Sequence, residues 1–359
     1  MRVRLRVAAP VRPSRGAVRA AFVLGLSLSA LAGQADAAKF AGAFMEDGGG
    51  ARALAMGGAF VAVADDPSTV FWNAAGLAGT PARQALLMHE ERFGGLVDRD
   101  FAAYVQPVDW ALLGGERGGF GVGLIRLGVD DIPFTAHLAE SLDTNDDGVV
   151  SREETFGLFT LQDQIRFESD QELALIVAYG EQRGDWRLGG ALKIVRQSVG
   201  DYSSLGLGFD LALLRPRIWR GLDVGLKIQD ATTTYLSWST GENEVIVPAV
   251  VPGAAYRWAL PRWEATVLLA ASLETRVEDR GEADQFDAGD VSANAHLGLE
   301  VGFRDRVFLR SGFDSGFGAE HFTAGAGFRL LPLTVDYAYA GDTLDIDEVT
   351  HRISLSTRF

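Results

Sequence analysis

The sequence predicts an all-β protein, a 14-stranded antiparallel transmembrane β-barrel. Three observations favour this fold. From residue 83 to the end, polar and apolar residues alternate with a period of two. The connections between the alternating stretches switch between short turns and long acidic loops. The last nine residues keep the alternation and end on Phe359, whereas the final strand of a soluble protein usually continues into a polar tail.

The first 37 residues have the composition of a secretory signal peptide. Residues 2–19 contain six arginines and no acidic residue, an apolar stretch covers 20–32, and Ala35-Asp36-Ala37 is a small-x-small cleavage site. The apolar stretch is too short to span a membrane as a helix. We therefore expect cleavage near Ala37, a mature chain that starts at Ala38, and export to the bacterial outer membrane.

Charge and composition exclude several function classes. The chain has a net charge of −15, and removal of the arginine-rich leader makes the mature chain more acidic, which argues against nucleic acid as a partner. There is no cysteine, so neither a disulfide framework nor thiol chemistry is available. The five histidines are dispersed and no Gly-x-Ser-x-Gly motif occurs, so we expect no enzyme activity. His296 and Ser292 share a strand face, but a hydrogen-bonded lumen histidine explains that pair better than a hydrolase.

Fourteen stretches after residue 82 are predicted to be strands, an even number as bacterial single-chain barrels require. They are 83–92, 97–108, 119–130, 170–181, 185–196, 204–214, 221–230, 252–260, 262–276, 292–304, 305–314, 320–330, 332–340 and 350–359. Charged residues occupy many positions on the face opposite the apolar one, which a water-filled lumen tolerates and a soluble core does not. These positions are Arg187, Lys193, Asp210, Asp223, Lys227, Glu264, Glu300, Asp336 and Arg352.

The connections separate a membrane barrel from a soluble β-sandwich, which would show the same alternation. The segment 131–169 holds nine acidic residues and two arginines, and 277–291 holds six acidic residues and one arginine. Such long loops on one side and short turns on the other are typical of outer-membrane barrels, with the turns in the periplasm. Five tryptophans fall in or beside the predicted periplasmic turns, as an aromatic girdle would. They are Trp110, Trp186, Trp219, Trp258 and Trp263.

Residues 38–82 interrupt this pattern and are predicted to form the plug, while 83–359 form the barrel. The segment is rich in Gly and Ala, which suits a chain threaded through a confined space, and Asp66-Pro67-Ser68-Thr69 has the composition of a helix start. It resembles the N-terminal hatch of the FadL-type transporters and, more closely, of the related PorV/PorQ proteins. The matching residues are the opening at 50–54, Met56-Gly57-Gly58-Ala59, 61–66 and Trp72-Asn73-x-Ala75-Gly76-Leu77. The ending at 350–359 also resembles the closing strand of PorV/PorQ, and a strand of this kind is read by the barrel-assembly machinery.

The resemblance implies a barrel plugged by its N-terminus and two possible functions. PorV/PorQ-type members act with secretion components at the outer surface, so the first expectation is a non-enzymatic surface scaffold with secreted proteins as partners. The alternative is a FadL-like channel for uptake of hydrophobic small molecules such as fatty acids or aromatic hydrocarbons. Acidic loops would repel carboxylates and slightly favour the first. The family usually has Asn-Pro-Ala where this chain has Asn73-Ala74-Ala75, which leaves the turn less rigid.

Asp65, Asp66, Trp72 and Asn73 are the candidates for functional hatch residues in this segment. The simpler interpretation is that they cap short helices and pack the plug, which is the usual role of such residues.

Residues 143–154 match the calcium-binding loop of an EF-hand at every position. Oxygen ligands are expected from Asp143, Asn145, Asp147, the carbonyl of Val149, Ser151 and the bidentate Glu154, and Gly148 occupies the sharp turn. Hard oxygen donors at this spacing fit Ca²⁺ and not a soft metal. The loop lies within the predicted extracellular loop 131–169, so we expect Ca²⁺ to order that loop rather than to signal.

Overall fold

A computed structural model describes residues 42–278, 280, 284–314, 321–341 and 349–359. The predicted signal peptide, 1–37, and residues 38–41 lie outside the described residues. So do parts of the acidic connections, namely 279, 281–283, 315–320 and 342–348. Among the described helices, none is long and apolar enough to cross a membrane.

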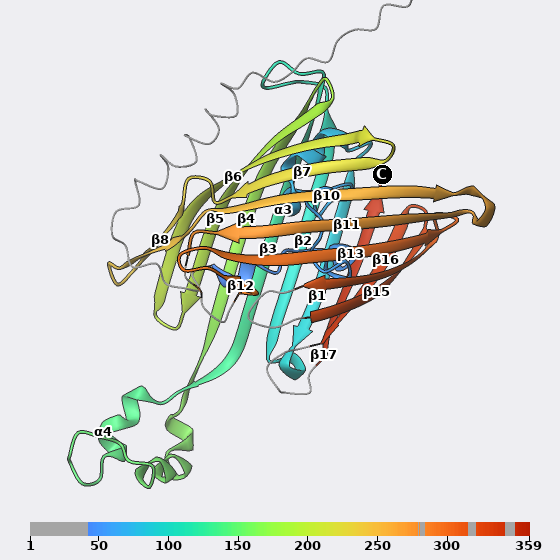
Figure 1. Ribbon diagram of the computed structural model, residues 1–359. Coiled ribbons are helices and arrows are strands. Elements are labelled where there is room, and N and C mark those ends of the chain that lie inside the picture. Colours follow the sequence, from blue (N-terminus) through green and yellow to red (C-terminus); the bar gives the residue numbers. More distant parts are fainter. Residues whose placement is uncertain (1–41, 279, 281–283, 315–320, 342–348) are drawn as a thin grey trace, which may run out of the picture. The chain divides into compact units, whose positions relative to one another are not determined.

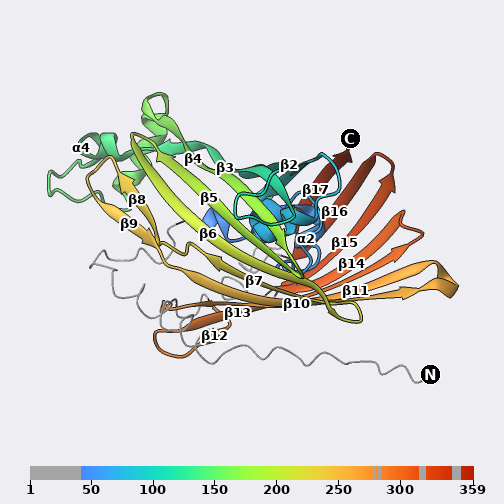
Figure 2. The ribbon, with the colours of Figure 1, turned by 90° about the horizontal axis from the view of Figure 1, so that it is seen from above.

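Fourteen strands pair in sequence order into a closed antiparallel ring (Figures 1 and 2). They are β1 (Gln84–Arg92), β2 (Val97–Val108), β3 (Arg117–Phe134), β4 (Arg166–Arg183), β5 (Trp186–Val199), β6 (Tyr202–Trp219), β7 (Leu222–Gln229), β10 (Ala249–Leu260), β11 (Ala265–Arg276), β13 (Ser292–Phe303), β14 (Val307–Asp314), β15 (His321–Leu330), β16 (Leu333–Gly341) and β17 (Val349–Arg358). β1 closes the ring, because Gln84 lies opposite Arg358 of β17 on one side and Val105 of β2 on the other. The backbone N–H of Phe359 donates to the carbonyl of Arg83, 3.0 Å away. The predicted 14-stranded barrel is confirmed.

Three further strands lie outside the ring order and were not predicted: β8 (Thr234–Trp238), β9 (Asn243–Ile246) and β12 (Phe286–Asp287). β7 ends at Gln229, and the chain turns through Asp230 and Thr233, which both have positive φ. It then pairs again with β6 as β8, which forms a hairpin with β9. β7 and β8 therefore both pair with β6, and together they occupy one place in the wall.

Alternate residues of each strand face opposite sides of the wall. On β11, Leu268 and Ala270 are buried, while Leu269 and Leu273 are about two-fifths exposed. A wall whose outer face consists of exposed leucine, valine and aromatic side chains is suited to contact with lipid. Most of the charged positions predicted to face inward are buried, among them Lys193, Asp210, Lys227, Glu300 and Asp336. Glu264 is an exception, because it lies in the turn before β11, exposed and paired with Arg304.

The two ends of the barrel differ. At one, named here the short-turn end, the connections are 109–116, 184–185, 220–221, 261–264, 304–306 and 331–332. The five tryptophans of the predicted girdle all lie there and are between 40% and 71% exposed, so their predicted location is confirmed. The opposite end carries the longer connections, although 93–96 and 200–201 are short there too.

The β3–β4 hairpin continues beyond its neighbours as an arm, residues 130–170, which projects from the other strands in Figure 1. β3 passes a register shift between Val129 and Ile132 and reaches Phe134, so the connection is 135–165 rather than the predicted 131–169. Short helices form the tip of the arm: η5 (Ala136–Leu138), α4 (Ala139–Leu142), η6 (Glu154–Thr160) and η7 (Gln162–Gln164).

The N-terminal segment, residues 42–80, has its own short helices. They are η2 (Ala43–Met45), α2 (Ala51–Leu54), α3 (Thr69–Trp72) and η3 (Ala74–Gly79), and the remaining helices, η4 (Phe93–Gly95) and η8 (Pro261–Trp263), lie in turns. α2 packs against β15, β16 and β17, and η3 packs against β2 to β6. Almost every residue from 48 to 78 is buried, which gives the molecule a packed core on the inner side of the wall.

Candidate functional site

The N-terminal segment touches the wall where the strands present glycine. A Cβ built on Gly312 of β14 would lie 2.2 Å from the backbone nitrogen of Gly57, and one on Gly298 of β13 would lie 2.7 Å from the carbonyl oxygen of Met56. Across the ring, a Cβ on Gly189 of β5 would lie 2.2 Å from the nitrogen of Ala75. These strands therefore place glycine on the inner face where the backbone of the N-terminal segment contacts the backbone of the wall.

Arg52 of α2 is the centre of an ion-pair network between the segment and the wall. Its guanidinium donates to both carboxylate oxygens of Glu300 on β13, at 2.8 and 3.0 Å. It also contacts Asp65 at 2.5 Å and Asp66 at 3.2 Å. The side chain of Arg52 is only 15% exposed and that of Glu300 10% exposed, so these charges are compensated by one another rather than by water.

The network continues into the wall on both sides. Arg310 of β14 joins Glu300 at 2.7 Å and Asp336 of β16 at 2.8 Å. On the other side, Asp65 accepts from Arg257 of β10 at 2.8 Å. The two predicted hatch carboxylates therefore bind arginine, and Asp65 links the segment to β10, two strands from β13 along the ring.

The two carboxylates differ in their acidity. Burial favours the protonated form of Asp65, but the charges of Arg52 and Arg257 outweigh it and lower its pKa to about 2. Burial raises the pKa of Asp66, and Arg52 offsets this only in part because the charge of Asp65 adds to it. Asp66 Oδ1 also accepts from the backbone N–H and hydroxyl of Ser68, just before α3. This is the helix-start role that the sequence suggests.

Trp72 and Asn73 are buried and hydrogen-bonded. The Trp72 indole N–H donates to the carbonyl of Gly49 at 2.8 Å. The Asn73 amide donates to the carbonyls of Val61, at 2.8 Å, and of Leu213 on β6, at 3.1 Å, while its oxygen accepts from Ala75 N–H. Asn73 thus closes a turn inside the segment and also attaches it to the wall.

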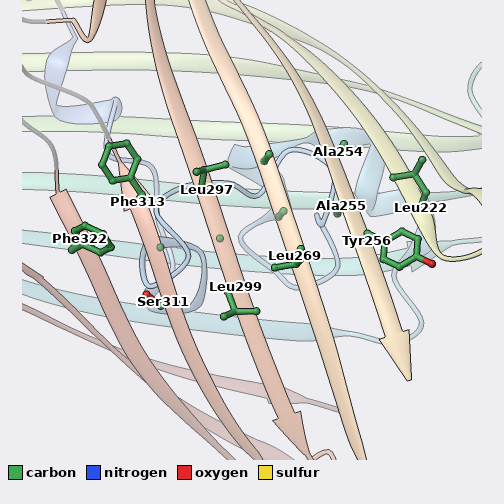
Figure 3. A pocket seen from close by; sticks show the side chains of 14 residues that line it. Leu222, Ala254, Ala255, Tyr256, Leu269, Leu297, Leu299, Ser311, Phe313 and Phe322 are labelled. Atoms are coloured by element: carbon green, nitrogen blue, oxygen red, sulfur yellow. The ribbon is translucent and has the colours of Figure 1, made fainter. Parts of the chain in front are cut away.

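An apolar hollow of about 730 Å³ lies against the wall at β7, β10, β11, β13, β14 and β15 (Figure 3). Its lining includes outward-facing side chains such as Leu269, Leu297 and Phe322, which are 43%, 53% and 74% exposed. Gly298 and Gly312 also line it, and these are the positions that Met56 and Gly57 touch from the other side. At Gly298 and Gly312, only the backbone of β13 and β14 therefore separates the hollow from the N-terminal segment. The two strands remain paired there.

The predicted calcium loop has many hydrogen bonds of its own. Glu154 Oε1 accepts from the backbone and hydroxyl of Thr144 at 2.7 and 2.8 Å, and Oε2 accepts from those of Ser151 at 2.9 and 2.8 Å. The backbone N–H of Gly148, with φ of 80°, donates to Asp143 at 2.8 Å. These donors lower the pKa of Glu154 to about 2, with the Ser151 backbone N–H the largest cause. Among the described residues, no three acidic or histidine side chains are arranged to hold a metal ion.

Sequence reasoning found two residues that connect the segment to the wall, Asp65 and Asn73, and missed the others. It singled out Asp65 and Asp66 but not Arg52, although an arginine within a run of Gly and Ala is costly to bury without a partner. It placed Glu300 in the lumen without a partner. For Gly298 and Gly312, the strand alternation predicts only that they face inward. Nothing in the sequence marks them as contacts of the N-terminal segment.

No family model matches the sequence, and no curated protein matches it. Solved structures do match. The toluene transporter TodX of Pseudomonas putida aligns with a TM-score of 0.57 and 12% identity, over 87% of this chain and 99% of the transporter. The toluene transporter TbuX of Ralstonia pickettii aligns with a TM-score of 0.53 and 13% identity, over 87% and 99%. At such low identity the likeness shows the fold, and the chain therefore shares the barrel architecture of these two transporters.

Proposed function

We propose that this protein is an outer-membrane channel for hydrophobic small molecules, plugged by its N-terminal segment. The observation that carries the proposal is the apolar hollow. It is separated from Met56 and Gly57 of the N-terminal segment by Gly298 and Gly312, which have no side chains. A hydrophobic ligand needs a concave, mostly apolar site, and the hollow has this character. The fold shared with TodX and TbuX, both described as toluene transporters, supports the same class of ligand.

The N-terminal segment is the plug in this proposal. Its backbone reaches β5 on one side of the ring and β13 and β14 on another, and Arg52 and Asn73 attach it to the wall. Passage of a ligand requires displacement of part of this segment, because its residues from 48 to 78 are almost all buried.

Uptake of toluene tests the channel. The chain and its variants are expressed in bacterial cells without such a channel, and uptake of labelled toluene is followed. Ala271 is exposed on β11 in the hollow, so Ala271→Trp fills the hollow from outside and should reduce uptake severalfold. Ala326 is also exposed, on β15, and does not line the hollow, so Ala326→Trp is the matched control.

Equal uptake by the two tryptophan variants would contradict a role for the hollow. If cells with the wild-type chain take up toluene no faster than cells without it, the channel proposal fails. The secretion-associated scaffold of PorV/PorQ type would then be the better proposal. It rests on the resemblance of the hatch and of the closing strand, and no comparison supports it.

The calcium site in residues 143–154 also remains a proposal. The donor set fits Ca²⁺, because every ligand position offers oxygen. The loop already turns at Gly148, and its carboxylates point at their own backbone donors. Ca²⁺ would have to draw Glu154 away from Thr144 and Ser151, so we expect weak binding, with Kd on the order of 10⁻⁴–10⁻³ M.

Calorimetry with Ca²⁺ on the full chain tests this site. Glu154→Gln should abolish the binding heat, since the bidentate ligand is lost. Glu153→Gln removes a neighbouring exposed charge that is not at a ligand position, so it should leave binding unchanged. Binding that is unchanged in Glu154→Gln would refute the assignment.

A further inference from the structure

A second apolar hollow, about 610 Å³, lies on the outer side of the wall at β3 to β7. It is named here the Gly190 groove. Its lining is apolar and includes Phe120, Leu188, Leu192, Phe209, Leu211 and Ile228. Tyr179 forms one side of the groove. Its ring is stacked on that of Trp110, with the two ring centres 5.0 Å apart.

Gly190 creates this groove. In the antiparallel register, Gly190 of β5 lies opposite Tyr179 of β4 and opposite Leu211 of β6, and both neighbours have large side chains. A Cβ on Gly190 would lie 3.0 Å from the Phe209 ring, so even a small side chain would begin to fill the space. The preceding residue, Gly189, points inward to Ala75. Two adjacent glycines thus serve opposite faces of the wall.

The groove changes character toward the short-turn end. Leu188 lies opposite Glu181 and Leu213, and the next outward residue on β5, Trp186, lies opposite Arg183. The guanidinium of Arg215 lies 5.2 Å from the centre of the Trp186 ring. Trp186 is four residues from Gly190, or about 13 Å along an extended strand. From Gly190 toward the short-turn end, the groove is therefore first apolar and then carries the aromatic Trp186 with the cationic Arg183 and Arg215, while Glu181 is buried between them.

The nearby acidic residues leave these arginines able to bind an anion. Glu181 is buried, and its carboxylate accepts from Leu113 N–H at 2.8 Å and from the Tyr179 hydroxyl at 2.9 Å. Asp185 pairs with Arg215 at 3.3 Å but is 81% exposed. An exposed pair of this kind contributes little to stability, so a phosphate can replace it.

We propose that the Gly190 groove is a phospholipid site, with an acyl chain along the groove and the phosphate at Arg183 and Arg215. This inference goes beyond the channel function and rests only on the proposed location of the barrel in a membrane. The apolar chain and the anionic group of a phospholipid are complementary to the apolar groove and to the arginines at its end. Arginine binds phosphate with paired hydrogen bonds, and tryptophan is suited to the interface between headgroup and chain.

Lipid retention by the folded full chain tests the site. The chain is purified in detergent, incubated with dioleoyl-phosphatidylglycerol, and the bound lipid is counted by native mass spectrometry. Gly190→Leu fills the groove and should reduce retention at least severalfold. Ala326→Leu adds the same side chain on the outer face of β15 and should have no effect.

A second pair of variants tests the phosphate. Arg183→Gln combined with Arg215→Gln should reduce retention severalfold, whereas Arg262→Gln, an exposed arginine in another turn at the same end, should not. This pair leaves Gly190 and its packing intact, so it decides the question if Gly190→Leu does not fold. Folding of each variant is checked by the heat-dependent shift of the band in gel electrophoresis.

Three results would overturn the proposal. One is retention by the double arginine variant equal to that of Arg262→Gln. Another is stronger retention of a neutral hydrocarbon than of the phospholipid. The third is dimerisation that Gly190→Leu abolishes, which would show a second copy of the chain in the groove. Toluene uptake is measured separately, so failure of this site leaves the channel proposal standing and failure of uptake leaves this site standing.

Discussion

The N-terminal segment and the arm are both irregular stretches attached to the same wall, but they are held differently. Residues 42–80 bind strands around the ring through Arg52, Asn73 and close backbone contacts. The arm, residues 130–170, is stabilised by hydrogen bonds between its own residues, such as those from Thr144 and Ser151 to Glu154. Leu138 and Leu142 are buried at its tip, while Phe156 and Phe159 are more than three-fifths exposed.

The difference indicates where each stretch obtains its stability. The segment shares one apolar core with the inner side of the wall, so a change in it should alter the stability of the whole barrel. The arm has a small core and its own network, so it should order and disorder by itself. Four predictions test this contrast, from the largest expected effect to the smallest.

Arg52→Gln should have the largest effect. It removes the cation that Glu300, Asp65 and Asp66 share in a largely buried site. Arg310 and Arg257 still compensate Glu300 and Asp65, so the cost should lie at the lower end of the about 3–5 kcal/mol typical of a broken buried pair. The free energy of unfolding, measured by urea titration of the barrel in lipid, should fall by that order. Arg304→Gln is the control, because Arg304 and Glu264 form an exposed pair at 75% and 61% exposure. Equal losses in the two variants would contradict a wall-dependent segment.

Asn73→Ala should have an intermediate effect. It removes donors to Val61 and Leu213 and the acceptor for Ala75 in a fully buried site. Leaving buried carbonyls unsatisfied costs about 1–3 kcal/mol. The same urea titration measures the loss, and Asn243→Ala, an exposed asparagine on β9, should be neutral. A neutral Asn73→Ala would show that Asn73 does not hold the segment to β6.

The sequence predicted regular features of this molecule well and long-range contacts poorly. The period of two located the ring strands because inward and outward residues must differ in polarity along every strand. It missed the end of β3, because Asp130 and Asp131 have the composition of a loop. In the structure Asp131, with φ of 58°, lies at a register shift and the hairpin continues beyond it. It missed β8 for a similar reason, since Asp230 and Thr233 interrupt the alternation.

The site was predicted only where its residues are neighbours in sequence. Asp66 and Ser68 are two residues apart, and their place at a helix start follows from the local sequence alone. Arg52 and Glu300 are 248 residues apart, and their pairing depends on the register of β13 and on how the segment is folded. No local sequence pattern indicates a pairing between residues so far apart in the chain.

Acid should loosen the arm and expose it to protease. The ordinary pKa of a glutamate, 4.5, falls to about 2 for Glu154 because of its hydrogen bonds. Its stabilising contribution is therefore complete above about pH 4.5 and is lost as the pH falls through about 2. Pepsin cleavage within 135–165, without added calcium, should become faster over this range. Glu154→Gln should remove this pH dependence. Asp65 loses its charge over the same range, but cleavage within 42–80 should stay slower than in the arm, because that segment is buried against the wall.

Replacement of residues 135–165 by Asn-Gly should have the smallest effect on the barrel. Phe134 and Arg166 lie opposite each other at the end of the hairpin, and Asn-Gly forms the two-residue turn that suits such a pair. Because the arm tip is stabilised by its own contacts, the free energy of unfolding should change by no more than about 0.5 kcal/mol, as for a surface change. Calcium binding should disappear completely. A loss of barrel stability comparable to that of Arg52→Gln would mean that the arm, like the segment, is coupled to the wall, and the contrast between them would fail.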